Sequence, residues 1–474
     1  KRVTGSCPEP STFNAILTAI ENTINYQVLN MPSEKIQLEN NLVLRSATID
    51  DAEEVAEFNS IVMAEPPEMT PEPEIGEWTL DLFDGVNRRV GPSDFTVIED
   101  TKTGKIVSSI VYISQVWNIG SVDTPMGMPE IVGTHPDYRR RGLIRKQFDV
   151  MHYWGKQRGH FFNTVMGIPY YYKQFGYEYA LDAWGGRATA RTALGGVLPK
   201  KDAKPVLSAR DAERTDVPFI VETELNSRQR LFVTTTRDAQ NFESEMFDRR
   251  EGNMVFYRTR ILEQEGVPVA YYEYNVTTKR DMIRVNSLEI SSSVNWLDAT
   301  SSMLVDLKKL ADELVSVDGG KCEKVEFEIG SGHPAFKLFD SQFGSEKKPY
   351  AWVIRVPDVA ALVSHIYPVI ERRLSASDLR GWSGDLKLSF YRSGLKMNFD
   401  AGKLTAVENT GPIERHEAHA HYPDLSFTKA LFGQKSFTQL REALDDCFAE
   451  KRADHVLQDI LWGGKQASGV LPTN

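Results

Sequence analysis

The pattern of apolar and polar positions predicts alternating strands and helices over most of the chain. Between residues 94 and 133, three apolar segments are separated by turns: DFTVIED, IVSSIVYISQVW and PEIVG. Such segments, bounded by turn residues, are typical of neighbouring β-strands. Apolar residues then recur at helical spacing, and Gly159 stands where a helix would end, which predicts a helix from about residue 143 to residue 158. A further apolar strand, FFNTVM, follows that helix.

The same order returns with weaker signals between residues 190 and 357. Strands, a helix within LDATSSMLVDLKKLADEL and a strand KVEFEI lead to GSGHPAFKLFDSQFG. That stretch shares its Gly, its Pro, an aromatic residue and the closing Phe-Gly with the earlier GIPYYYKQFG, so we interpret the region as a duplicated domain. The first copy has RRRGLI before its helix, whereas the second has LDAT, without a glycine or a cation. We therefore expect a structural role for the second copy.

The chain divides into four expected segments. Residues 1–40 form an N-terminal extension, in which apolar residues at helical spacing after Ser11 and Thr12 predict a docking helix. Residues 41–189 and 190–357 hold the two copies. Residues 358–474 form an α+β module, whose strands DLKLSF and GLKMNF each present one apolar face. The predicted fold class is α+β or mixed α/β, with two tandem related domains before the module.

Composition and charge mainly exclude classes of function and of site. The 66 Asp and Glu residues outnumber the 55 Lys and Arg residues, and the resulting net charge of -11 argues against broad binding to nucleic acid or to an anionic membrane. Cys7, Cys322 and Cys447 are far apart and odd in number, which favours neither a disulfide framework nor a thiolate metal site. With no apolar run of about 18 residues and no secretory pattern, a cytoplasmic location is expected.

Against this acidic background, GTHPDYRRRGLIRKQF (residues 133–148) gathers five cations around Gly142. Three explanations compete: a nucleic-acid patch, a solvated basic helix face, and a helix start that binds a phosphorylated cofactor. A helix start presents unpaired N–H groups and the positive end of the helix dipole, and a glycine lets a phosphate approach the backbone. The third explanation therefore accounts for the glycine, the arginines and their place between strand and helix together, whereas a nucleic-acid patch explains only the arginines.

These residues also carry a family resemblance. RRRGLI after an apolar strand, followed by a second strand and YYKQFGY, resembles the GNAT acyltransferase superfamily, whose pyrophosphate loop follows Q/R-x-x-G-x-G/A. Arg139 and Gly142 match that motif, while Ile144 stands where Gly or Ala is usual, which is similar to the Eis-like (enhanced intracellular survival) acetyltransferases. The resemblance covers roughly residues 40–474. It implies a catalytic GNAT domain, a degenerate GNAT domain and a C-terminal sterol-carrier-protein-like domain, in which PDLSFTKALFG is the similar stretch.

The resemblance further implies acetyl-CoA as co-substrate, held between the splayed strand ends at residues 131–133 and 164–166. Backbone groups of Ile131, Val132 and Gly133 would bind its pantetheine arm. Its pyrophosphate would lie against the stretch after that strand, which comprises Arg139, Arg140, Arg141, Gly142, Leu143 and Ile144. Eis-like relatives suggest a homo-hexamer, and neither a nucleic acid nor a membrane is expected as a partner.

Acetyl transfer to an amine needs an acceptor for the amine proton and a donor for the departing thiolate. Tyr172, three residues before Phe175-Gly176, stands where Eis-like enzymes have their general-acid tyrosine. Neighbouring Tyr171 is an alternative, and the tyrosines of this run also suit a purely structural aromatic face. Glu130 is a candidate to accept a proton through water. In Eis proteins the terminal carboxylate reaches the acetylation site, which implies that role for Asn474, although the end GVLPTN lacks the aromatic terminus of that group.

The expected function is acetyl-CoA-dependent N-acetylation of a primary amine of a small, cationic substrate, by direct attack in a ternary complex. Carboxylates between residues 50 and 78 would form an acidic approach, and the Pro- and Glu-rich segment MAEPPEMTPEPEIGEW within that range is expected to be a loop or lid. The alternative is a non-catalytic scaffold that binds acyl-CoA or lipid. HEAHAH (residues 416–421) lacks the H-E-x-x-H spacing of zinc proteases. On a strand, Glu417, His419 and His421 would share a face that suits a metal, but a polar strand edge is the favoured interpretation, so no metal site is expected.

Overall fold

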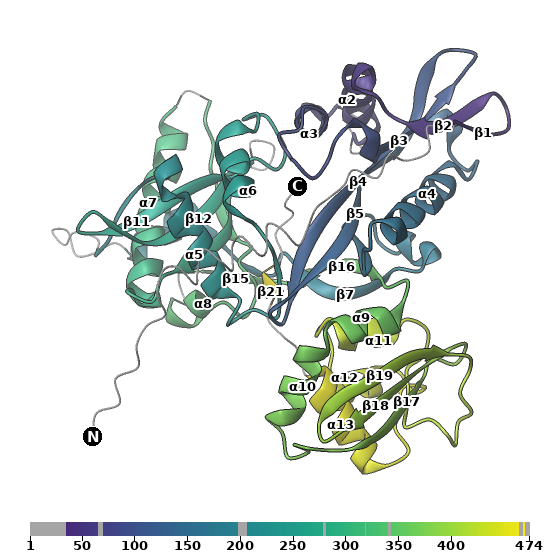
Figure 1. Cartoon of the computed structure of the whole chain (residues 1–474). Coiled ribbons are helices and arrows are strands. Elements are labelled where there is room, and N and C mark those ends of the chain that lie inside the picture. Colours follow the sequence, from purple (N-terminus) through teal and green to yellow (C-terminus); the bar gives the residue numbers. More distant parts are fainter. Residues whose placement is uncertain are drawn as a thin grey trace, which may run out of the picture.

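The computed structural model describes residues 35–64, 70–197, 206–277, 281–317, 319–339, 343–463 and 468–469. Three β-sheets organise this part of the chain, each with its own helices (Figure 1). The fold is therefore the predicted mixture of α and β elements in several units. The helix predicted near the N-terminus lies outside the described residues. No helix among the described residues combines the length and apolar character that crossing a membrane requires.

The first sheet is antiparallel at one end and receives strands from distant parts of the chain at the other. In spatial order, its main path consists of β1 (Ile36–Gln37), β2 (Leu42–Ser46), β3 (Phe95–Asp100), β4 (Lys105–Ile119), β5 (Val122–Thr134), β6 (Phe162–Val165), β16 (Tyr350–Arg355) and β7 (Glu178–Ala183). Two short strands extend it beside β4: β10 (Val233–Thr235), which pairs with β4, and β21 (Ser468–Gly469), which pairs with β10.

Helices cover both faces of the first sheet. α2 (Ala52–Val62) and α3 (Pro73–Phe83) share one core with strand residues such as Ile113 and Met128. α4 (Leu143–Gln157) packs through Phe148 and Met151 on the opposite face, against Tyr112 of β4. The predicted helix is thus confirmed, and Gly159 follows it in the left-handed conformation with a φ of 70°.

The prediction of a loop or lid at residues 63–78 is wrong for the second half of that segment. Residues 73–78 belong to α3, which begins with Pro73 at its first position, where the missing N–H of proline costs nothing. Trp78, Leu82 and Phe83 of this helix are buried in the core. The apolar residues at helical spacing outweigh the proline-rich composition that suggested a loop.

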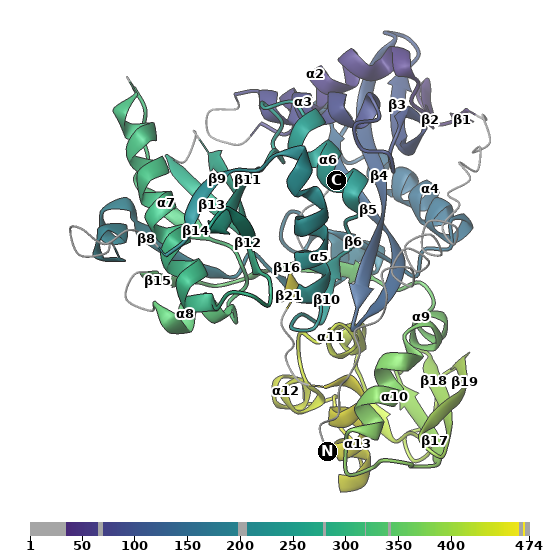
Figure 2. The same cartoon turned by 60° about the vertical axis from the view of Figure 1, so that its left-hand side comes forward.

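The second sheet repeats the plan of the first, with a long helix between two parallel strands. Its order is β15 (Ser345–Lys347), β8 (Gly186–Ala190), β14 (Lys324–Phe327), β13 (Met282–Ile290), β12 (Val267–Thr277), β11 (Arg258–Gln264) and β9 (Ser208–Asp211). α7 (Trp296–Ser316) covers one face. α5 (Val217–Ser227) and α6 (Ala239–Glu243) cover the other (Figure 2). The short helix α8 (Pro334–Leu338) follows β14.

The first two sheets exchange strands. The chain leaves β7 of the first sheet and enters β8, which pairs with β14 and β15 of the second. It returns from β15 into β16, which pairs with β6 and β7 of the first. A division at residues 189 and 357 therefore does not separate the two sheets, because β16 completes the first sheet and β8 is part of the second.

The third sheet, in the order β19 (Lys403–Thr410), β18 (Gly394–Asp400), β17 (Gly384–Ser389) and β20 (Ala420–His421), belongs to the C-terminal module. Leu386, Leu388, Leu395 and Met397 are fully buried, as the alternation in the sequence predicted. Within the described residues, five helices accompany it: α9 (Val359–His365), α10 (Tyr367–Ser375), α11 (Ser426–Leu431), α12 (Phe437–Ala443) and α13 (Arg452–Trp462).

Candidate active site

A bulge in β5 interrupts the first sheet at the residues expected to bind the pantetheine arm. Ser109 of β4 pairs with Gly133, and Val111 pairs with Glu130, so β5 carries one residue more than β4 over this interval. Ile131, inside the bulge, has a φ of 50°, a conformation that β-branched residues rarely adopt. Such a bulge leaves backbone groups out of the ladder and turns them away from the neighbouring strand.

On its other side, β5 soon separates from β6. The two strands run parallel and pair only at Met126 with Phe162 and at Gly127 with Asn163. On its far edge, β6 pairs with β16 from Asn163 to Val165. Among the described residues, the end of β5 that contains Ile131, Val132 and Gly133 therefore has no partner strand on the β6 side. The expected opening between residues 131–133 and 164–166 matches this divergence.

The start of α4 lies directly after this open end. Gly142 is its N-terminal cap, in the left-handed conformation with a φ of 74°, and a Cβ atom placed there would meet nothing within 4 Å. Three of the five cations have protein partners: Arg139 donates to the carbonyl of Thr134, Arg141 to the carbonyl of Asp137, and Arg145 to Gln174. Among the described residues, the side chains of Arg140 and Lys146 have no such partner. An open backbone and unengaged cations thus meet at a helix N-terminus, where anions bind favourably.

A buried polar link fixes α4 relative to the bulged strand. The amide of Gln147 donates to the carbonyl of Thr96 on β3 at 2.9 Å, and its oxygen accepts from the hydroxyl of Ser108 at 2.7 Å. The same Ser108 hydroxyl lies 2.9 Å from the carbonyl oxygen of Gly133. The helix start and the end of β5 are therefore held in one arrangement by a network that sequence reasoning did not find.

Tyr172 lies in the segment that follows β6. It belongs to a short 3₁₀ turn, Tyr171–Phe175, and its ring is buried against Phe148 of α4. The ring packs so closely on Gly167 that a Cβ atom there would lie 2.4 Å from the Tyr172 Cε2 atom and 2.9 Å from its hydroxyl oxygen. Among the described residues, that hydroxyl has no hydrogen-bond partner. Of the two candidate tyrosines, Tyr172 is the buried one, while Tyr171 is only partly buried and packs edge-on against Phe175.

Two further tyrosines hold the segment that carries Tyr172. The hydroxyl of Tyr350, from the exchanged strand β16, donates to the carbonyl of Gly167 at 3.0 Å. The backbone N–H of Tyr170 donates to the hydroxyl of Tyr179 on β7. Because Tyr350 is 183 positions from Gly167, no local pattern in the sequence pointed to it.

The C-terminal module also contacts this segment. Glu178 accepts from Lys173, the neighbour of Tyr172, at 2.9 Å, and its other oxygen lies 3.1 Å from the amino group of Lys429 on α11. Lys429 also donates to the carbonyl of Tyr179 at 2.6 Å. These contacts hold the pKa of Glu178 below its usual value, although burial acts against them.

Glu130 lies beside the bulge. It is on the α2 and α3 side of the sheet, because it follows the core residues Met126 and Met128 at two-residue spacing and so shares their face of the strand. No cation pairs with it among the described residues. Burial raises the pKa of Glu130 to about 8, while a hydrogen bond from the backbone of Ile131 acts in the opposite direction. Burial, followed by the nearby charge of Glu130, raises the pKa of Tyr172 above its usual value, so this hydroxyl keeps its proton at neutral pH.

Two further predicted site features are the C-terminal residue and the carboxylates at positions 50–78. Asn474 lies outside the described residues. Of the carboxylates at positions 50–78, Asp51 is paired with Arg45, Glu54 accepts from the backbone of Ile106, and Glu77 lies 3.3 Å from Arg250. These three therefore serve structural contacts instead of an open acidic approach.

A known protein family matches the region that contains these residues. Residues 43–180 match the family model of the acetyltransferase (GNAT) domain. No curated protein matches the chain. The matched range contains the bulge, the basic helix start and Tyr172. Residues 43–180 thus form a GNAT acetyltransferase domain, and the protein is an acyltransferase.

Solved structures share the architecture beyond that domain. A GCN5-related N-acetyltransferase from Anabaena variabilis ATCC 29413 is 12% identical, with a TM-score of 0.62 over 90% of this chain and 98% of its own. A GCN5-related N-acetyltransferase from Kribbella flavida is 15% identical, with a TM-score of 0.60 over 91% of this chain and 98% of its own. Eis1 from Mycobacterium abscessus is 13% identical, with a TM-score of 0.55 over 90% of this chain and 99% of its own. At these identities the likeness concerns the fold, and its extent includes all three sheets.

Proposed function

We propose that the protein is an Eis-like, acetyl-CoA-dependent N-acetyltransferase that acetylates a primary amine of a small cationic substrate by direct attack in a ternary complex. One arrangement carries the proposal: Glu130 lies at the bulge where β5 has diverged from β6, and Tyr172 lies in the turn after β6 with its ring packed on Gly167. A proton acceptor and a proton donor near one another suit acyl transfer from a thioester to an amine.

The residues around the opening fit acetyl-CoA. Backbone groups of Ile131, Val132 and Gly133 lie where β5 has diverged from β6 and are suited to hydrogen bonds with the amides of the pantetheine arm. The Gly133 carbonyl already accepts from Ser108, and the Ile131 N–H already donates to Glu130. The stretch Arg139–Ile144 suits the pyrophosphate, because Gly142 leaves the helix N-terminus accessible and Arg140 is an unengaged cation beside it.

The proposed reaction balances through these two side chains. The amine nitrogen attacks the thioester carbonyl carbon, a C–N bond forms and the C–S bond breaks. Glu130, in its ionised form, accepts the proton that the amine loses, directly or through water. Tyr172 donates its proton to the departing thiolate. The products are an amide and a thiol, and return of the proton from Glu130 to Tyr172 restores both groups.

The order of domains supports the Eis-like type. We propose residues 41–189 as the catalytic GNAT domain, residues 190–357 as the degenerate one and residues 358–474 as a sterol-carrier-protein-like domain, with β8 and β16 exchanged as described. The contacts of Lys429 with Glu178 and Tyr179 give the third domain an architectural role beside the Tyr172 segment.

The deciding experiment is thiol release from acetyl-CoA, measured with and without a panel of primary amines. Amine-dependent thiol release, with acetylated amine found by mass spectrometry, is the expected result. Calorimetry on the same protein measures acetyl-CoA binding separately. Binding without thiol release for any amine in the panel would favour a non-catalytic acyl-CoA-binding scaffold, and absence of both would overturn the proposal.

A further inference from the structure

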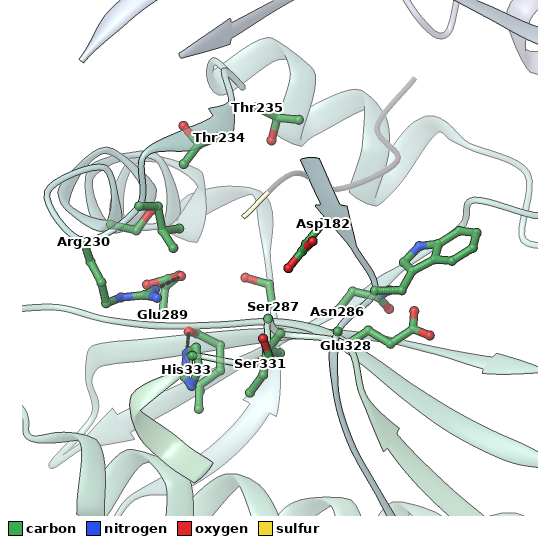
Figure 3. Close-up of a pocket in the computed structure, with 18 of the residues that line it drawn as sticks. Asp182, Arg230, Thr234, Thr235, Asn286, Ser287, Glu289, Glu328, Ser331 and His333 are labelled. Atoms are coloured by element: carbon green, nitrogen blue, oxygen red, sulfur yellow. Dashed lines mark hydrogen bonds and ion pairs between the residues drawn. The ribbon is translucent and has the colours of Figure 1, made fainter. Parts of the chain in front are cut away.

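The second sheet contains an opening of its own. Glu273 and Tyr274 of β12 are adjacent, yet their partners on β13 are Ser287 and Val285, so Asn286 forms a bulge like that of β5. β13 and β14 run parallel and pair only as far as Val285 and Phe327. Beyond this point lies a cavity of about 530 Å³ (Figure 3). Its volume is in the range of small-molecule sites, about 300–1,000 Å³.

The cavity lies on the face of the second sheet that α5 covers. Its lining includes Glu224 and Arg230, in and just after α5, and no described residue of α7. The start of α7 is on the other face, and the side chain of Asn295 already accepts a hydrogen bond from the backbone of Asp298 there. The cavity is therefore separate from the helix N-terminus that would receive a pyrophosphate.

Polar atoms in the cavity wall lack partners. Among the described residues, Glu224 Oε1, Asn286 Oδ1 and Thr234 Oγ1 are buried atoms without a hydrogen bond. Their residues are only 8%, 5% and 3% exposed, respectively. Leaving a buried polar atom unpaired is costly, and more so for a charged group. Two of the three are acceptors only, so the missing partner is a hydrogen-bond donor.

The charges around Glu224 leave a negative excess. Arg237, which is fully enclosed, donates to Glu224 and Glu273, and also to Glu245. Arg249 lies 3.4 Å from Glu245 and balances it. One guanidinium thus faces the two remaining carboxylates. Burial raises the pKa of Glu224 although Arg237 acts against it, as expected of a carboxylate whose charge is incompletely compensated.

The wall also carries the carboxylates of Asp182 and Glu346, and its other charges are paired. Arg230 donates to Glu289 at 2.6 Å, on the left of the view in Figure 3. Glu328 is contacted by Lys347 and lies 3.3 Å from Arg284. No free cation remains among the described lining residues to attract an anion. Ser287 and Thr235 add hydroxyl groups, which accept hydrogen bonds from an ammonium group or a hydroxyl alike.

We propose that this cavity is a second ligand site, which binds a small organic ammonium ion through Glu224 and Asn286. An ammonium group supplies both the missing positive charge and the missing hydrogen-bond donors. The site lies beyond the proposed catalytic function, since it contains none of the residues around Glu130 and Tyr172. It nevertheless borders the catalytic sheet, because Thr234 and Thr235 belong to β10, which pairs with Trp117 and Asn118 of β4.

The test is calorimetry on the full chain without acetyl-CoA, with 1,4-diaminobutane as probe and 1,4-butanediol as its neutral counterpart. Diamine binding without comparable diol binding is expected. Glu224→Gln keeps the shape of the side chain and removes its charge, and should weaken diamine binding at least about tenfold. Glu222→Gln, an exposed position on the same helix, is the matched control and should bind as the wild type does.

A second variant keeps the proposal testable if Glu224→Gln does not fold. Ser287→Trp fills the cavity without removing a buried charge and should abolish the binding, whereas Glu130→Gln in the catalytic site should preserve it. Binding that is lost in Glu130→Gln but kept in Ser287→Trp would place the diamine in the catalytic site and overturn the proposal. Equal binding of the diol would overturn it as well. Thiol release is measured in a separate assay, so the proposal of a diamine site and the proposal of acetyl transfer can each be overturned independently of the other.

Discussion

The hydroxyl of Tyr350 donates a hydrogen bond to the backbone carbonyl of Gly167 at 3.0 Å, across 183 positions of sequence. Tyr350 begins β16, the strand that leaves the second sheet region and inserts between β6 and β7 of the first. Gly167 is the residue on which the ring of Tyr172 packs. The exchanged strand thus supports the proposed proton donor from a part of the chain that lies outside the matched GNAT domain.

Tyr350→Phe should lower kcat by about threefold to tenfold, because a net hydrogen bond of this kind contributes about 1 kcal/mol. The KM for acetyl-CoA should change little, since Tyr350 is a positioning residue. In a Tyr172→Phe background the same substitution should have no further effect on kcat. Tyr367→Phe, at an exposed tyrosine, is the control. Additive losses in the double variant would argue against an action through Tyr172.

Tyr172→Phe should lower kcat by about 100-fold or more, because the thiolate loses its proton donor. Acetyl-CoA affinity, measured by calorimetry, should stay close to that of the wild type. Tyr171→Phe is the matched control. It removes the hydroxyl of the neighbouring tyrosine, whose ring is less buried than that of Tyr172. If Tyr171→Phe is impaired and Tyr172→Phe is not, the roles of the two tyrosines must be exchanged.

Gly167→Ala should lower kcat by about tenfold to 100-fold through displacement of Tyr172, since small shifts of a reacting group are costly. The added Cβ atom would lie 2.4 Å from the Tyr172 ring and cannot be accommodated without movement. Gly411→Ala adds a Cβ atom that meets nothing within 4 Å and should be neutral. Steady-state kinetics together with circular dichroism checks this, and wild-type turnover in Gly167→Ala would contradict the position assigned to Tyr172.

Arg140→Glu should weaken acetyl-CoA binding by about tenfold to 100-fold, because it replaces an unengaged cation at the helix N-terminus by an anion. Arg392→Glu makes the same charge change at an exposed position of the third domain and should leave the affinity unchanged. Calorimetry measures both. A duplex oligonucleotide serves as a further ligand: salt-sensitive binding to it, without binding to acetyl-CoA, would support the nucleic-acid explanation of the arginines.

Turnover should rise with pH through about 8, since the pKa of Glu130 is raised to about 8 and only its ionised form accepts a proton. An acceptor amine whose own pKa lies well below 8 keeps its titration out of the profile. Glu130→Gln should lower kcat and remove this step from the profile. A step that persists near pH 8 in Glu130→Gln belongs to another group.

The same raised pKa has a consequence for stability. The folded protein holds a proton on Glu130 at pH values where the unfolded chain has released it. This contribution is fully present below the ordinary pKa of a glutamate, 4.5, and is lost as the pH rises through about 8. Relative to the wild type, Glu130→Gln should therefore gain thermal stability as the pH rises from about 4.5 to about 8, which differential scanning fluorimetry can follow.

The sequence by itself determined the local elements and the chemistry that neighbouring residues create. Helical spacing placed α4 within one residue of its observed end, and Gly142 beside three arginines indicated an anion site at the start of that helix. Alternation identified the buried faces of β17 and β18. These features depend on contacts within a turn or between adjacent strands, so the pattern of residues along the chain is sufficient to reveal them.

Only the tertiary structure decided what distant segments bring together. It assigned α3 to the core, inserted β16 beside β6, placed Tyr350 on Gly167 and set Lys429 against Glu178. It also enclosed Glu224 and Asn286 in a cavity where one side-chain oxygen of each has no hydrogen-bond partner in the described part of the chain. Strand exchange and burial depend on the summed packing of residues far apart in the chain, and no short stretch of sequence contains that information.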